Sequence, residues 1–104
     1  MKAKIKTIDV NAKEWFDRVN GNSYFAGSVT INLGLKTQQS FNMPFQYGYG
    51  NQYEHEAGYV LKRAKVIEID EHTALWRYCN DNKIILRCHI QTNCKKKELM
   101  YYNE

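Results

Sequence analysis

At the centre of the chain stands Phe45-Gln46-Tyr47-Gly48-Tyr49-Gly50-Asn51-Gln52-Tyr53, an aromatic segment broken by two glycines. An alternating apolar run precedes it, and a run of helical spacing follows it. We therefore predict a strand-to-helix junction, in which Gly48 and Gly50 permit the turn and Asn51 caps the helix. Backbone N–H groups at a helix N-terminus are free to meet an anion. The junction is either a binding loop or a purely structural connection, and the sequence leaves both open.

Two strand patterns lead into this junction. Residues 23–33 alternate, so that Phe25, Val29 and Ile31 share one face, and this period of two is typical of a half-buried strand. Residues 38–47 alternate in the same way. Pro44 has no N–H to donate within that run, which indicates an edge strand or a bulge.

The chain before residue 23 is less regular. Residues 2–10 alternate between lysines and apolar side chains, which predicts a strand with a kink near Thr7. Residues 11–18 form a segment too short for a long helix. The pair Asn20-Gly21 then marks a turn.

Helical spacing follows the junction over residues 53–64, with Glu54 in the capping-box position. A short strand or linker at 66–69 and a second helix ending at Asn80, capped by Asp70 or Thr73, come next. Residues 83–91 alternate as a strand, and 98–102 would close a hairpin with it. The order predicts one α+β domain over residues 1–104, with an antiparallel sheet of about five strands and two helices packed on one face.

Composition narrows the class of protein. The chain has 104 residues, of which 43% are hydrophobic and 25% charged, so it is expected to fold. It contains no apolar run long enough to span a membrane and no signal peptide. Its three cysteines include no C-x-x-C pair, which favours a reducing compartment. We therefore expect a cytoplasmic protein without membrane association.

Positive charge is concentrated near the C-terminus. Residues 83–104 carry five Lys or Arg and two Glu, which is +3 of the total charge of +4. Lys95, Lys96 and Lys97 are therefore candidate contacts for an anionic partner. The alternative is that they form the solvated turn of the last hairpin.

Motifs for metal binding and catalysis are weak. Cys88 and His89 would point to opposite faces of a strand, and no ligand pair has the spacing of a zinc site. His55 lies between Glu54 and Glu56, but adjacent helical positions face different directions. No nucleophile motif is present. We therefore expect no metal ion, no cofactor and no catalytic residue.

Three segments together carry a resemblance: Trp15-Phe16, Gly21-Asn22-Ser23-Tyr24 and the residues 45–53 quoted above. Over residues 8–64 the chain resembles a group of small bacteriophage-encoded proteins of unassigned function. The resemblance implies a phage or prophage origin, and small phage proteins often bind a host factor.

From these features we expect a non-enzymatic phage accessory protein that binds a host macromolecule, such as a defence or regulatory protein, in the host cytoplasm. The alternative is a nucleic-acid or nucleotide binder that uses the same loop together with Lys95, Lys96 and Lys97. The candidate contact residues are Tyr47, Gly48, Tyr49, Gly50, Asn51, Gln52, Tyr53, Trp15 and Tyr24.

Overall fold

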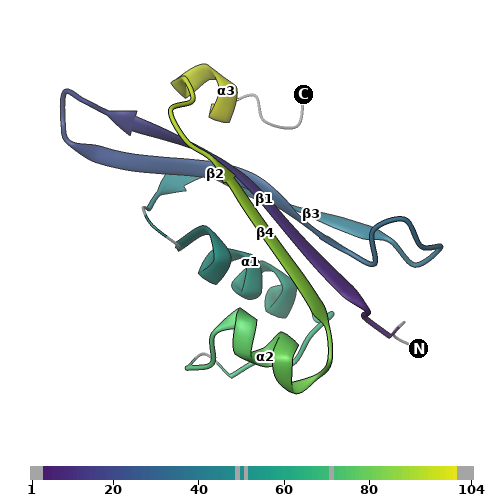
Figure 1. The fold of residues 1–104 in the computed structure, drawn as a ribbon. Helices are drawn as coiled ribbons and strands as arrows, with labels where there is room; N and C mark the ends of the chain where they lie inside the picture. Colours follow the sequence, from purple (N-terminus) through teal and green to yellow (C-terminus); the bar gives the residue numbers. More distant parts are fainter. Residues whose placement is uncertain (1–3, 49, 51, 71, 101–104) are drawn as a thin grey trace.

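The computed structural model describes residues 4–48, 50, 52–70 and 72–100 (Figure 1). Over these residues the chain forms four strands and three helices, which confirms the α+β class. In chain order they are β1 (Thr7–Asp17), β2 (Asn22–Ile31), β3 (Gln39–Tyr47), α1 (Gln52–Arg63), α2 (Leu75–Asp81), β4 (Ile85–Gln91) and α3 (Lys96–Met100).

The strands form a single mixed sheet in the order β3-β2-β1-β4. β1, β2 and β3 pair as an antiparallel meander, whereas β4 lies parallel to β1, with Thr7 opposite Ile85 and Lys13 opposite Gln91. The prediction of five antiparallel strands is therefore wrong for the described residues. The chain crosses from β3 to β4 through α1 and α2, so β4 runs in the same direction as β3. In the meander this is also the direction of β1, and β4 therefore pairs with β1 in parallel. Pro44 lies on β3, at an edge of the sheet as expected.

The main core lies between the sheet and the layer formed by α1 and α2, which cover one face (Figure 1). The alternation in β2 directs its larger apolar side chains toward this layer. Fully buried members of the core are Ile8, Val10, Phe25, Val29, Met43, Ala57 and Leu61.

The third helix lies on the opposite face of the sheet (Figure 1). Residues 98–102 were expected to be a strand, but α3 covers the part of this segment that the structure describes. The Glu98 carboxylate accepts a hydrogen bond of 2.6 Å from the backbone N–H of Lys95, which caps the first turn. Leu99 is then buried with Ala26 and Cys94 in a second, smaller core.

β1 is longer than its sequence pattern indicates. The segment 11–18 was described only as too short for a long helix, yet it is part of the strand, which continues to Asp17 opposite Asn22. Trp15 and Phe16 project to opposite faces, so no single apolar face marks this half of the strand. The expected turn at Asn20-Gly21 closes the β1–β2 hairpin.

Other local expectations differ in detail. Residues 66–69 form no strand. The N-cap of α2 is Ala74, without a side-chain cap, in place of Asp70 or Thr73. Asp70 instead accepts a hydrogen bond of 3.0 Å from the His72 N–H, which holds the loop before the helix. Asn51 lies outside the described residues.

Candidate functional site

The β1–β2 hairpin extends beyond the helix layer. β1 has 11 residues and is roughly 35 Å long, whereas α1 has 12 residues and is about 18 Å long. α1 therefore covers at most about half of the hairpin. The distal half, which ends in the turn after Asp17, carries α3 on its other face (Figure 1).

Four aromatic side chains lie side by side across the distal half of the sheet. They are Trp15 on β1, Tyr24 on β2, and Phe45 and Tyr47 on β3, and we call them the aromatic row. The ring centroids of Trp15 and Tyr24 are 5.4 Å apart, and those of Tyr24 and Phe45 are 5.2 Å apart with an interplanar angle of 6°. Tyr47 meets Tyr24 edge-on at 5.8 Å. These are favourable aromatic geometries, so the row is a rigid unit.

The aromatic row is only partly covered. The small core under α3 packs against Trp15, Tyr24 and Phe45, which remain half-buried. Tyr47 keeps 55% of its side-chain surface exposed at the end of the row. The row therefore combines fixed ring positions with solvent access, as a contact surface requires.

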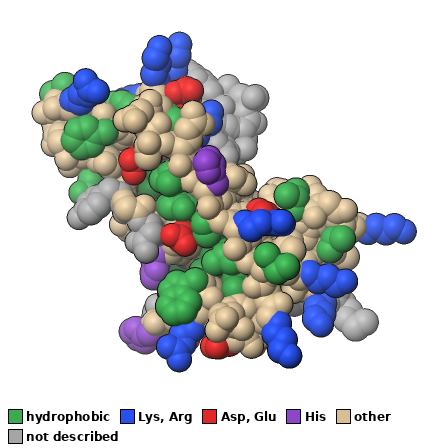
Figure 2. All heavy atoms as spheres, viewed as in Figure 1, with side chains coloured by type: hydrophobic (Ala, Val, Ile, Leu, Met, Phe, Trp, Pro, Cys, Tyr) green, Lys and Arg blue, Asp and Glu red, His purple; other side chains and the backbone are tan. Residues whose placement is uncertain are grey.

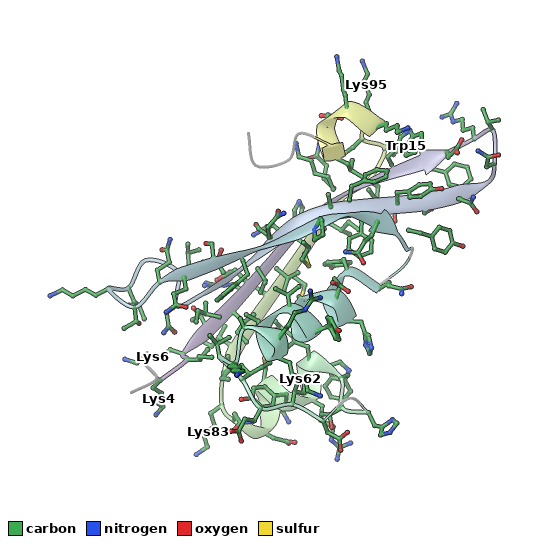
Figure 3. The ribbon with its side chains drawn as sticks, turned by 180° about the vertical axis from the view of Figure 1, so that it is seen from behind. Lys4, Lys6, Trp15, Lys62, Lys83 and Lys95 are labelled. Atoms are coloured by element: carbon green, nitrogen blue, oxygen red, sulfur yellow. The ribbon has the colours of Figure 1, made fainter. Side chains whose placement is uncertain are left out.

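Lysines flank the row at the start of α3. Lys95, Lys96 and Lys97 are all exposed, and Figure 3 shows Lys95, the residue before α3, projecting beyond Trp15. The Lys96 ammonium lies 5.6 Å from the centroid of the Trp15 ring, a cation–π geometry. The expected hairpin turn is absent from the described part of this segment, because these lysines begin a helix.

A hollow of about 510 Å³ opens beside the row, and we call it the distal hollow. β4 pairs with β1 only as far as Lys13, so the outer edge of β1 beyond it faces the segment 93–96. Phe16 is half-exposed and Val19 is 92% exposed at this site. The lining residues are Trp15, Phe16, Asp17, Arg18, Val19, Asn93, Cys94, Lys95 and Lys96.

The rim of the distal hollow is mainly cationic. Arg18, Lys95 and Lys96 contribute positive charge, against the carboxylate of Asp17. That carboxylate accepts hydrogen bonds from the Asn20 side chain at 2.8 Å and the Val19 N–H at 3.0 Å. The hydrogen bond from the Asn20 side chain is the largest cause that lowers the pKa of Asp17, and the bond from Val19 and the charge of Lys96 lower this pKa further. Asp17 therefore stays ionised and engaged in the turn.

The glycine junction is built as the sequence indicates. The Gly48 N–H donates to the Ser23 carbonyl at 3.0 Å, and a Cβ at Gly48 would lie 2.6 Å from the Phe25 ring. Gly50 has φ +66°, a conformation that favours glycine. Tyr49 and Asn51 lie outside the described residues. The junction thus depends on close backbone approach to the core.

The structure separates the candidate residues into two groups. Trp15, Tyr24 and Tyr47 lie together at the distal end of the sheet, where the Lys96 ammonium faces the Trp15 ring. The aromatic row and the distal hollow together form what we call the distal surface. Tyr53, by contrast, is 7% exposed and belongs to the main core, where burial and then the charge of Glu54 raise its pKa to about 12. Gly48 is buried and Gln52 begins α1.

Several members of the distal surface were not among the candidate residues, and its large apolar ones are Phe16, Val19 and Phe45. Phe45 lies within the quoted aromatic segment, and the period of two places it on the same face as Tyr47. Phe16 was noted only as part of the pair Trp15-Phe16 and Val19 gave no signal, because the exposure of both depends on where the helix layer ends.

Reactive groups outside the distal surface are dispersed. Among residues 4–48, 50, 52–70 and 72–100, no three His, Cys, Asp or Glu side chains are placed to hold a metal ion. Cys79 is buried in the main core, which raises the pKa of its thiol to about 11. Cys88 is exposed on β4, and desolvation, followed by a hydrogen bond and the charge of Glu54, raises the pKa of its thiol to about 12.

These pKa values predict slow thiol chemistry. At pH 8 fewer than about one in a thousand Cys79 or Cys88 thiols would be ionised, and the thiolate is the reactive form. We expect Cys79 and Cys88 of the native protein each to react with Ellman's reagent at least ~100-fold more slowly than free cysteine, with rates that rise about tenfold per pH unit. Fast reaction of Cys88 at pH 8 would contradict this, and unfolding in guanidinium should release all three thiols as a control.

Within the described residues, α1, α2 and α3 are all too short to cross a membrane. Searches for relatives gave no match with any protein-family model, curated protein or solved structure, so the function has to be inferred from the distal surface itself.

Proposed function

We propose that this protein is a non-enzymatic accessory protein of phage or prophage origin that binds a host protein through the distal surface. The observation that carries the proposal is the aromatic row, in which Trp15, Tyr24 and Tyr47 come from three strands yet lie together with Tyr47 exposed. Trp and Tyr are the residues most enriched among the energetic anchors of protein interfaces.

The distal hollow supplies the second part of this contact. Phe16 and Val19 present apolar surface there without an obvious role in folding, because both extend past the helix layer. Arg18, Lys95 and Lys96 line it with positive charge. Figure 2 shows several Lys or Arg side chains at the end that carries α3. An apolar side chain flanked by acidic residues on the partner would complement this surface.

Binding of nucleic acid is the second candidate, and the Lys96–Trp15 contact favours it. Proteins that bind single strands combine such cations with ring faces on which bases stack. In the aromatic row, however, the Tyr24 ring stacks on both Trp15 and Phe45, whose ring centroids lie 6.5 Å from each other, and Lys96 lies over the Trp15 ring. Because Trp15, Tyr24 and Phe45 are half-buried and packed on one another, they offer a stacking base little free ring face, and contacts with a protein fit the row better.

Affinity capture from a bacterial host lysate tests the proposal. The wild type should retain a discrete protein, and Tyr47→Ala or Phe16→Ala should reduce the affinity by about tenfold or more, as removal of an interface anchor does. Tyr59→Ala is the matched control, because Tyr59 is also 55% exposed but lies on α1. Equal loss with Tyr59→Ala, or full retention with both distal variants, would refute it.

A salt titration separates the two candidates. Binding of a labelled single-stranded oligonucleotide should strengthen steeply as salt falls if Lys95, Lys96 and Lys97 contact phosphates. We expect weak binding that Tyr47→Ala leaves unchanged. Tight binding that requires both Tyr47 and the lysines would favour the nucleic-acid function instead.

A further inference from the structure

A second cavity lies on the helix layer, away from the distal surface. This groove of about 590 Å³ runs between the outer face of α1 and the segment 69–75, and we call it the helix groove. An adjoining hollow of about 500 Å³ shares Lys62, Lys65, Ile69 and Asp70 with it, so the two are continuous. This volume is in the range of small-molecule sites. Figure 3 shows Lys62 in the helix layer, at the other end of the molecule from Trp15.

The charge of the helix groove is unbalanced. Lys62, Arg63 and Lys65 line the two hollows, against Glu68 in the adjoining hollow and Asp70, whose carboxylate already accepts a hydrogen bond from the His72 N–H. Among the described residues no salt bridge joins these three cations to a carboxylate. The groove therefore favours an anionic ligand.

Gly58 occupies the floor of the groove in the middle of α1. Glycine is the least favourable residue after proline in a helix interior. Packing does not require it, because the nearest atom to an added Cβ would be the Leu75 Cβ at 3.6 Å, an ordinary contact. The missing side chain does, however, deepen the groove.

Lys65 is a second residue that the fold does not favour. It follows α1 with φ +63°, in the left-handed region where glycine is the usual residue after a helix. A lysine is less stable than glycine in this backbone conformation, but at this position its side chain lines both hollows. Residues that are suboptimal for folding often mark sites of function.

The walls of the groove suit a flat organic group. Tyr59 is exposed beside Ile69 and Leu75, and the Arg63 guanidinium lies 4.7 Å from the centre of its ring. From these features we infer that the helix groove binds a small aromatic phosphate of the nucleotide class. The base lies against the apolar wall, and the phosphates meet Lys62 and Lys65. This site is independent of the distal surface and of the function proposed for it.

Two-dimensional amide NMR with the four common ribonucleoside diphosphates as probes tests the inference. At least one probe should bind with a Kd of about 1 mM or tighter and perturb amides of residues 55–65 and 69–75. The matching nucleoside and pyrophosphate should each bind about tenfold more weakly, because each lacks half of the contacts. No perturbation by any diphosphate, or pyrophosphate binding as tightly as the best diphosphate, would overturn the site.

Two variants distinguish a ligand site from a merely structural one. Gly58→Ala and Lys65→Gly should each raise the midpoint of thermal unfolding by about 3–5 °C. Both should weaken the best diphosphate by about fivefold or more. Lys83→Gly is the matched control, because Lys83 has φ +56° after α2 but does not line the groove. It should stabilise the fold and leave binding unchanged. Unchanged affinity in Gly58→Ala and Lys65→Gly would contradict the inference.

Discussion

Replacing Asn32 with Ala is expected to lower the free energy of unfolding by about 2–4 kcal/mol. Asn32 is fully buried at the end of β2, and its side chain connects three segments. Its Oδ1 accepts from the Lys6 N–H at 2.7 Å, and its Nδ2 donates to the Lys4 carbonyl at 3.0 Å and to Thr37 Oγ1 at 2.9 Å. Alanine would leave these partners unsatisfied in a partly buried site. It would also fit poorly at φ +53°, which Asn tolerates better.

Urea unfolding of wild type and variant measures this loss. Thr37→Val removes only one of the three side-chain bonds and should cost about 1 kcal/mol. The two variants should therefore differ by at least ~1 kcal/mol, with unchanged m-values. Equal midpoints for Asn32→Ala and Thr37→Val would show that the connection of the N-terminal segment contributes little.

Phe25→Ala is expected to have the largest effect in the core, about 3–5 kcal/mol. Phe25 is 1% exposed, and its ring packs directly against the backbone at Gly48. Its removal should leave a cavity at the point where β3 turns toward α1. The junction should loosen together with the core.

Thermal unfolding and amide hydrogen exchange check this second prediction. Phe16→Ala is the control, because Phe16 is a half-exposed phenylalanine on the distal surface and its truncation should cost less than about 1 kcal/mol. Faster exchange at the Gly48 amide should accompany the loss of stability in Phe25→Ala alone. Comparable destabilisation by the two substitutions would mean that the burial of Phe25 is not what stabilises the junction.

Much of the fold could be predicted, because the period of the apolar residues follows the local element. The strands predicted at 23–33, 38–47 and 83–91 correspond to β2, β3 and β4, and the helix predicted at 53–64 corresponds to α1. A period of two identifies the face that a strand buries, but it does not identify the neighbouring strand. The parallel pairing of β1 with β4 could therefore not be predicted from the pattern of apolar residues.

The missed elements have a common physical cause. Trp15 and Phe16 are adjacent apolar residues that face opposite sides of a strand beyond the helix layer, so the pattern of a half-buried strand disappears. In α3, five residues carry too little periodicity to distinguish a helix from a strand. In the sequence Asn32 is only a polar residue at the end of a predicted strand. Its burial depends on contacts with Lys4, Lys6 and Thr37, which the apolar pattern does not reveal.

The candidate site was predicted in part. Trp15, Tyr24, Tyr47 and the lysines were singled out separately, and the strand register brings them together. Tyr53 lies in the core instead, since the first turn of α1 faces the sheet. The helix groove gave no sequence signal, because one of its walls is the loop between α1 and α2, and no periodicity indicates how a loop packs against a helix.

Photo-crosslinking in host cells directly tests whether a host protein binds through the distal surface. Benzoylphenylalanine would replace Tyr47 in one variant and the equally exposed Tyr59 in another. We predict a discrete crosslinked protein with the probe at position 47, absent with the probe at position 59. The same product from both positions, or no product from position 47, would contradict the account.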